Sequence, residues 1–286
     1  MKKVIRLCAF ADEADESLDG QIAALKRNGI EYLELRSVGG VNVKDITIAQ
    51  AKVYQDALKA NGIKVWSIGS PIGKVDLDCD FHEYEKTVRH IFSLANIFQT
   101  KRVRVFSFFN AYDNGEKVYS YLNRLTEIAD EYGLMLCHEN EKEVYGDTLQ
   151  RVLELKNRLP KMAFVYDPAN YLQVGEKAEN CLQTAHAFSE YYHIKDVAVA
   201  TDELVPAGEG DGRIDELIAK IDGEKVLSLE PHLKVFAGYA AIDNTQMKNR
   251  YSFESGNDAF DTAVSALKRL LKKAGYKEIK GEFIKE

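Results

Sequence analysis

The chain has 286 residues, of which 45% are hydrophobic and 29% charged, and this composition excludes an intrinsically disordered protein. Its net charge of −7 argues against a nucleic-acid partner, and no apolar run approaches the roughly 20 residues of a membrane span. We therefore expect a cytoplasmic protein that binds a small molecule and that binds neither nucleic acid nor membrane.

Eight short apolar or β-branched runs follow one another along the chain, and each is typical of a β-strand. In order they are Val4–Phe10, Tyr32–Ser37, Lys64–Ser70, Arg102–Phe109, Leu134–Asn140, Met162–Asp167, Tyr191–Asp196 and Lys225–His232. Helical periodicity in the intervals predicts helices over Leu18–Asn28, Ile48–Asn61, Glu83–Phe98, Val118–Tyr132, Thr148–Arg158 and Ile214–Ile221, with Ala259–Ala274 as the last. The weakest helical pattern follows Gly175.

One strand–helix unit recurs about every 30 residues, without a linker or a change of composition. Several of the helices are followed by glycine, as at Gly29, Gly62 and Gly133, which favours a left-handed C-cap before the next strand. Eight such units predict a single-domain (β/α)8 TIM barrel, an α/β fold, over residues 1–286. The alternative, a doubly wound sheet, is disfavoured because the first strand leads into Ala11–Asp15 and not into a glycine-rich phosphate loop.

Candidate metal ligands stand at the carboxyl ends of the fifth to eighth predicted strands: Glu139, Asp167, His193 and Glu230. In a barrel these ends share one face, and adjacent strands lie about 4.8 Å apart, so four side chains at equal height can converge on one ion. A lone carboxylate at a strand end is more often a cap or a loop acceptor, but four ligands in succession favour a metal site. Three carboxylates and one imidazole predict one divalent cation, Mn²⁺ first, with Mg²⁺, Co²⁺ or Zn²⁺ as alternatives.

With these four residues in this order, the sequence resembles the xylose-isomerase-like sugar phosphate isomerase/epimerase superfamily, which includes endonuclease IV and the ketose 3-epimerases. The resemblance spans nearly the whole chain and also rests on the stretches His193–Asp196, Val205–Gly212 and Leu229–His232. It implies a metal ion that binds two neighbouring oxygens of a sugar. It also implies that Glu139 and Glu230 lie on either face of the substrate as the catalytic pair for proton transfer.

Departures from the best-known members bear on the substrate. Ketose 3-epimerases commonly have a histidine shortly after the metal aspartate and an arginine shortly after the metal histidine. This chain has Asp167-Pro168-Ala169-Asn170 and His193-Ile194-Lys195-Asp196 at these places, which argues against a ketohexose substrate. Endonuclease IV-like enzymes need many histidines for a multinuclear zinc site, and this chain has only six, which argues against DNA repair.

Strand alternation extends the predicted site beyond the metal ligands, because residues two apart on a strand point the same way. Lys195 should share the inward face of His193, and His232 that of Glu230, so we expect both side chains to bind substrate. By the same parity His138 should point into the helix layer, where a structural hydrogen bond is expected of it.

Arg36 and Lys74 complete the predicted substrate contacts. Arg36 and Glu34 should face inward near the mouth of the barrel, although an internal ion pair is an equally good interpretation for them. Lys74 follows a glycine-containing strand end and could hold an anionic or hydroxylated substrate, with a solvated surface lysine as the alternative. Residues 233–252 form a loop longer than a barrel usually needs, and we expect a lid or a contact in a homo-oligomer there.

The favoured activity is that of a metal-dependent sugar or sugar-derivative isomerase or epimerase. Such an enzyme removes a proton from the carbon next to a carbonyl, and the metal stabilises the enediolate. A lyase or dehydratase acting on a keto-sugar, a keto-glycoside or an inosose begins with the same step and stays open. An inert barrel that binds a sugar or a partner protein is the alternative from another class.

Overall fold

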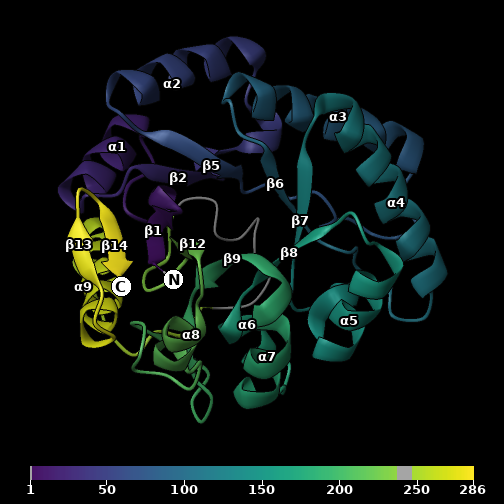
Figure 1. Ribbon diagram of the computed structural model, residues 1–286. Coiled ribbons are helices and arrows are strands. Elements are labelled where there is room, and N and C mark those ends of the chain that lie inside the picture. Colours follow the sequence, from purple (N-terminus) through teal and green to yellow (C-terminus); the bar gives the residue numbers. More distant parts are fainter. Residues whose placement is uncertain (1, 237–246) are drawn as a thin grey trace.

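The computed structural model describes residues 2–236 and 247–286, and a closed ring of parallel strands lies at its centre (Figure 1). The ring order is β1–β2–β5–β6–β7–β8–β9–β12, and β12 pairs in turn with β1. These strands are β1 (Lys3–Ala9), β2 (Tyr32–Leu35), β5 (Lys64–Ile68), β6 (Arg102–Val105), β7 (Met135–Glu139), β8 (Ala163–Tyr166), β9 (Ser189–Ile194) and β12 (Glu224–Leu229). The predicted (β/α)8 barrel is confirmed.

Helices surround the ring in chain order, as expected for βα units (Figure 1). They are α1 (Leu18–Arg27), α2 (Ile48–Ala60), α3 (Phe81–Ile97), α4 (Gly115–Tyr132), α5 (Leu149–Arg158), α6 (Pro168–Gln173), α7 (Ala178–Thr184), α8 (Ile214–Lys220) and α9 (Gly256–Lys273). Single 3-10 turns lie at η1 (Ala11–Glu13), η2 (Val43–Asp45), η3 (Tyr145–Asp147) and η4 (Ala185–Phe188). Where the sequence pattern is weakest, after Gly175, the chain forms only the short α7 and η4. None of the described helices is long and apolar enough to cross a bilayer.

The helix ends follow the chemistry of the sequence. Gly29, Gly62 and Gly133 all have positive φ, of 65°, 74° and 67°, and each ends its helix as predicted. At its start, α2 carries a reciprocal capping box in which Thr47 and Gln50 bond each other's backbone N–H groups. These short, defined ends hold each following strand at its place in the ring.

Side chains of the strands alternate between two apolar layers. Leu33 and Leu35 face the helices in the large outer core, whereas Cys137, Val165 and Tyr191 pack together inside the ring. The inner layer plugs the barrel below the carboxyl ends of the strands. Residues two positions further along β7, β8 and β9 therefore project into the space above this plug.

All eight barrel strands end earlier than predicted, and β6 and β12 are shortened the most. β6 ends at Val105 and not at Phe109, because the backbone N–H of Phe106 donates to Ile72 of the preceding loop and Phe108 has a φ of 72°. β12 ends at Leu229, immediately before the predicted ligand Glu230. The shortening leaves the ends of these strands as loops at the mouth of the barrel, where the parity of a regular strand no longer applies.

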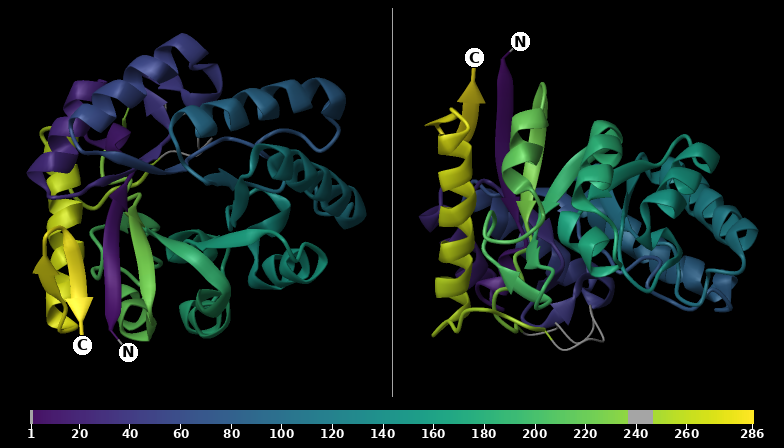
Figure 2. Two further views of the ribbon diagram at one scale, coloured as in Figure 1. Left: turned by 45° about the horizontal axis from the view of Figure 1, so that its top comes forward. Right: turned by 90° about the horizontal axis from the view of Figure 1, so that it is seen from below.

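A C-terminal hairpin, β13 (Lys277–Ile279) and β14 (Glu282–Lys285), is an element that the sequence patterns do not predict. β14 pairs antiparallel with the first half of β1, from Lys3 to Arg6, because β2 pairs only with the end of β1, at Cys8 and Ala9. Figure 2 shows the yellow hairpin beside β1, with both chain termini at the end opposite to the carboxyl ends of the barrel strands. Short pieces complete the fold: β3 (Ser37–Val38) with β4 (Val41–Asn42), and β10 (Asp196–Ala198) with β11 (Glu203–Val205).

Candidate metal centre

The four predicted ligands meet at the carboxyl ends of β7, β8, β9 and β12. One potential ligand atom from each of Glu139, Asp167, His193 and Glu230 lies within 4.8 Å of those of the other three. All four side chains are buried, with at most 2% of their surface exposed. Four consecutive strands of the ring thus bring together residues that are far apart in the sequence. Glu139 and Glu230, the first and the last of the four, are 91 positions apart.

The strand register explains the convergence better than the equal heights assumed from the sequence. Glu139 pairs with Val165, so Asp167 lies two residues beyond that partner, and His193 pairs with Ser228, two residues before Glu230. Between these two offsets, the pairing of Val165 with Tyr191 keeps Asp167 and His193 level. Strands in a closed barrel are tilted, and such offsets compensate for the tilt.

The local structure after β8 directs Asp167 toward the cluster. Its Oδ1 accepts a hydrogen bond from the backbone N–H of Asn170 at 3.0 Å and so caps α6. The side chain of Asn140 bonds the backbone N–H and C=O of Asp167, at 2.9 and 2.8 Å. The other carboxylate oxygen of Asp167, Oδ2, is therefore the one left for a cation.

His193 lies between carboxylates on both edges of its ring. Nδ1 lies 2.8 Å from Glu139 Oε1 and 3.2 Å from Glu230 Oε2, while Nε2 lies 3.1 Å from Glu34 Oε2. Glu34 also accepts hydrogen bonds from the hydroxyls of Tyr191, at 2.6 Å, and Ser228, at 2.7 Å. Strand parity turns Glu34 inward, but the sequence alone did not assign it to the metal site.

Three buried cationic side chains surround the carboxylates of the predicted ligands. Arg36 Nη1 lies 2.9 Å from Glu230 Oε1, and Lys195 Nζ lies 2.9 Å from Asp167 Oδ2. The third cation, Arg104 of β6, lies 3.2 Å from Glu139 Oε2 and was not among the predicted residues. The alternation Arg102-Val103-Arg104-Val105 is the signal that could have revealed it, because it places both arginines on the inward face.

The charges of the cluster shift the pKa values of its members. Burial would lower the pKa of His193, but Glu139, Glu34 and Glu230 raise it well above its usual range. Burial raises the pKa of Asp167 to about 7 despite the attraction of Lys195. Burial would likewise raise the pKa of Glu230, but Lys195 and His193 hold it well below its usual value. The metal-free cluster thus retains a proton at neutral pH.

The donor set fits a divalent cation. Glu139 Oε2 and Asp167 Oδ2 are buried and accept no hydrogen bond of good geometry from the described residues, although Arg104 and Lys195 lie near them. Buried carboxylate oxygens of this kind are costly without a partner. Glu139, Asp167, His193 and Glu230 would hold the ion through three carboxylates and one imidazole nitrogen, a set that suits Mn²⁺, Mg²⁺, Co²⁺ or Zn²⁺.

The other predicted substrate contacts lie at different distances from the cluster. Lys195 and His232 reach Glu230 at 3.8 and 3.6 Å, so both side chains point toward the cluster, although both residues lie beyond the ends of their strands. Lys74 instead lies 2.9 Å from Glu141 Oε2 and above the ring of Phe106, at the loops after β5 and β7.

Arg36 lies in internal ion pairs, but with Asp12, Glu13 and Glu230 and not with Glu34, which lies next to His193. It binds both carboxylate oxygens of Asp12 at 2.9 Å and lies 3.3 Å from Glu13. Of the predicted loop 233–252, residues 237–246 lie outside the described part. Its first residues reach the site, since Phe236 packs against Arg36 at 4.6 Å.

His138 points into the helix layer, as its parity predicts, where its ring lies 5.8 Å from that of Phe164. The expected structural hydrogen bond is absent, because neither ring nitrogen has a partner among the described residues. Burial lowers the pKa of His138 to about 3, so the ring is neutral at ordinary pH.

Comparison with known proteins agrees with this fold. The family model described as the xylose isomerase-like TIM barrel matches residues 22–235. The chain belongs to this family. No curated protein matches the chain in sequence.

Solved structures of the xylose isomerase-like family and related barrels superimpose on nearly the whole chain. A D-allulose 3-epimerase from Methylomonas sp. gives a TM-score of 0.72 at 15% identity, covering 93% of this chain and 98% of that one. The IOLI protein, solved with a bound zinc atom, gives 0.71 at 17% identity, covering 94% and 99%. The probable 3-DHS dehydratase AsbF of petrobactin synthesis in Bacillus anthracis gives 0.69 at 16% identity, covering 92% and 98%. At these identities the likeness establishes the fold.

Proposed function

We propose that this member of the xylose isomerase-like family is an enzyme that uses one divalent metal ion to isomerise or epimerise a small sugar or sugar derivative. The observation that carries the proposal is the convergence of four buried ligand atoms within 4.8 Å at the carboxyl face of the barrel, where the active sites of this fold lie. A bound divalent ion supplies Lewis-acid polarisation of the substrate carbonyl. Mn²⁺ is our first choice, and zinc is supported by the IOLI protein.

Glu139 and Glu230 are proposed as the acid/base pair. Glu139 ends β7 and Glu230 follows β12, the first and last of the four strands that bring the cluster together. A carboxylate that binds a cation through one oxygen keeps the other free to accept a proton from the substrate carbon. One glutamate can then remove the proton and the other can return a proton to the opposite face.

Lys195, His232, Arg36 and Lys74 are proposed to bind the substrate. Lys195 and His232 are the best supported of the four, because both lie within 4 Å of Glu230. Arg36 would act mainly by holding Glu230 in place, since its other donors are taken by Asp12 and Glu13. Lys74 would contact only an extended substrate, one that reaches Glu141.

A lyase or dehydratase is the second candidate, because it starts from the same proton abstraction and loses a β-substituent afterwards. The dehydratase among the structural neighbours, at 16% identity, supports keeping it. An inert barrel that binds a sugar is the third, and the buried ligand set argues against it, because buried carboxylates without a function are costly.

The test is metal content followed by proton exchange. The purified protein should hold about one divalent ion per chain after supplementation with Mn²⁺, measured by elemental analysis. Ketoses, 3-keto-glycosides, inososes and sugar-derived keto acids are then incubated with it in deuterated water and followed by NMR. Solvent deuterium should enter one carbon next to the carbonyl, and chelation should stop the uptake. A protein that takes up no metal and exchanges no substrate proton would support the inert barrel.

A further inference from the structure

Arg104 is a buried guanidinium with almost no hydrogen bonds. Arg104 is only 3% exposed. Among the described residues, its five N–H donors nevertheless make a single hydrogen bond, from Nη2 to the backbone oxygen of Ser70 at 3.4 Å. Nε has no partner, and Nη1 only approaches Glu139 and Glu230, at 3.2 and 3.5 Å. A buried charge is normally fully hydrogen-bonded, because leaving it unsatisfied costs free energy.

Arg36 provides the contrast at the same depth in the barrel. Its guanidinium makes hydrogen bonds to Asp12, Glu13 and Glu230, at 2.9 to 3.3 Å. Three of these four hydrogen bonds go to Asp12 and Glu13, which do not belong to the metal cluster. The carboxylates near Arg104, by contrast, are the proposed metal ligands, so a bound cation would compete with Arg104 for their oxygens.

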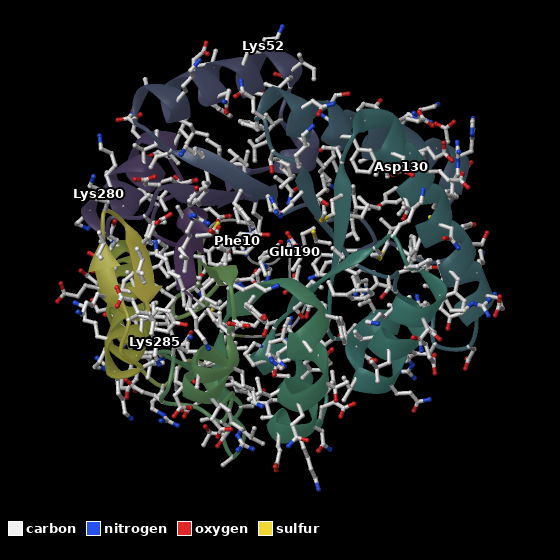
Figure 3. All side chains as sticks on the ribbon, viewed as in Figure 1. Phe10, Lys52, Asp130, Glu190, Lys280 and Lys285 are labelled. Atoms are coloured by element: carbon white, nitrogen blue, oxygen red, sulfur yellow. The ribbon has the colours of Figure 1, made fainter. Side chains whose placement is uncertain are left out.

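Besides the carboxylates of Glu139 and Glu230, two aromatic rings lie next to Arg104. The guanidinium carbon lies 5.2 Å from the ring centre of Phe10 and 4.7 Å from that of Phe106. Phe10 lies inside the ring of strands (Figure 3) and packs edge-on against His193, with 5.2 Å between ring centres. An anion bound by Arg104 would therefore lie beside the metal ligands and between aromatic faces, which suits a planar group.

We propose that Arg104 is the receptor for a carboxylate of the substrate, so that this enzyme acts on a keto acid or sugar acid and not on a neutral sugar. The inference rests on the proposed function and narrows its substrate class. A carboxylate accepts two parallel N–H bonds from a guanidinium and neutralises its charge. A sugar hydroxyl would accept from only one N–H donor and leave most of the other donors of Arg104 without a hydrogen bond.

The test compares an acid with its uncharged counterpart. D-Glycerate, glycerol and inorganic phosphate are titrated by calorimetry into the Mn²⁺-loaded parent, Arg104→Met and Arg104→Lys. Arg102→Met is the matched control, because Arg102 lies on the same strand and face but packs on Trp66 and pairs with Glu190, near the amino-terminal end of the barrel. Arg104→Met should weaken glycerate binding at least about tenfold, leave glycerol binding unchanged, and still bind Mn²⁺ at least as tightly as the parent, because Arg104 no longer competes for the ligand oxygens. Arg104→Lys should fall between, and Arg102→Met should match the parent.

Three results would overturn the inference: equal glycerate affinity in the parent and Arg104→Met, an equal loss of glycerol binding, or tighter binding of phosphate than of glycerate by the parent. If Arg104→Met does not fold, as judged by thermal unfolding, a loss of glycerate affinity in Arg104→Lys supports the role and parent-like affinity contradicts it. Failure of the parent to bind Mn²⁺ would refute the proposed metal function, and the same titrations on the metal-free protein would still decide the role of Arg104.

Discussion

Nε2 of His193 lies 3.1 Å from Oε2 of Glu34, on the opposite edge of the ring from the Nδ1 that faces Glu139 and Glu230. A carboxylate in this position holds the Nε2 proton, which leaves the Nδ1 lone pair for a metal ion. The hydroxyls of Tyr191 and Ser228 keep Glu34 in this orientation.

Glu34→Gln should therefore weaken metal binding by about 10- to 100-fold while the barrel stays folded. Calorimetric titration with Mn²⁺ measures the effect. Glu190→Gln is the matched control, because Glu190 lies on β9 three residues before His193 and pairs with Arg102, away from the ligands. Equal Mn²⁺ affinity in Glu34→Gln and the parent would show that His193 needs no such support.

Asp167→Asn separates the ligand role of Asp167 from its role as a helix cap. Asparagine can still accept the hydrogen bond from Asn170 that begins α6, but it lacks the negative charge at Oδ2. The variant should keep the thermal stability of the parent and lose tight metal binding and turnover. Full metal occupancy in this variant, measured by elemental analysis after dialysis, would remove Asp167 from the ligand set.

Strand periodicity predicts most of this site, because in a barrel the alternation of side chains along each strand decides which residues point inward. Glu139, Asp167 and His193 each lie two residues beyond an inner-layer residue, and the sequence reveals that spacing directly. Arg104 was not predicted, because a charged residue in a short alternating strand is as typical of a solvent-exposed edge strand as of a barrel strand with a functional inward face. The inward direction of Arg104 indicates a functional role only when the positions of the proposed metal ligands are known.

The C-terminal hairpin escapes prediction for a different reason. Residues 277–285 are short and charged, and β13 is exposed, so no apolar pattern distinguishes them from a tail. Only Phe283 is fully buried, and it pairs with Ile5. The hairpin depends on the half of β1 that β2 leaves unpaired, a tertiary feature that local sequence does not encode.

Stability should fall in mild acid because of His138. Burial lowers its pKa from 6.5 to about 3, so below pH 6.5 the unfolded chain takes up a proton that the folded chain refuses. The free energy of unfolding should then drop by up to about 1.4 kcal/mol per pH unit between these two pKa values. His138→Leu should remove this contribution, and urea unfolding at pH 7, 6 and 5 measures it. Parallel pH profiles for the variant and the parent would contradict the assignment.

Lys195 should contribute to substrate binding and turnover more than to metal binding. Lys195→Met keeps the length of the side chain but removes the charge 2.9 Å from Asp167, so we expect metal binding to persist and kcat/KM to fall at least about tenfold. Lys225→Met is the control, because this lysine donates to the backbone oxygen of Ser189 at the other end of the barrel. A Lys195→Met enzyme with parent kinetics would reduce the residue to a structural ion pair.

The acid/base pair makes the most discriminating prediction, because Glu139 and Glu230 approach the cluster from β7 and β12, its two outer strands. Glutamine at either position keeps the shape and one ligating oxygen but removes the basic oxygen. Turnover should therefore fall by about 10²-fold or more in each variant, the scale of general-base catalysis. If the reaction is an epimerisation, each variant should still exchange the proton of one epimer with deuterated water, and the two variants should differ in which epimer they exchange. NMR of the recovered substrate measures this. Exchange of both epimers at the parent rate in both variants would refute the two-glutamate mechanism and leave Lys195 and His232 as the next bases to test.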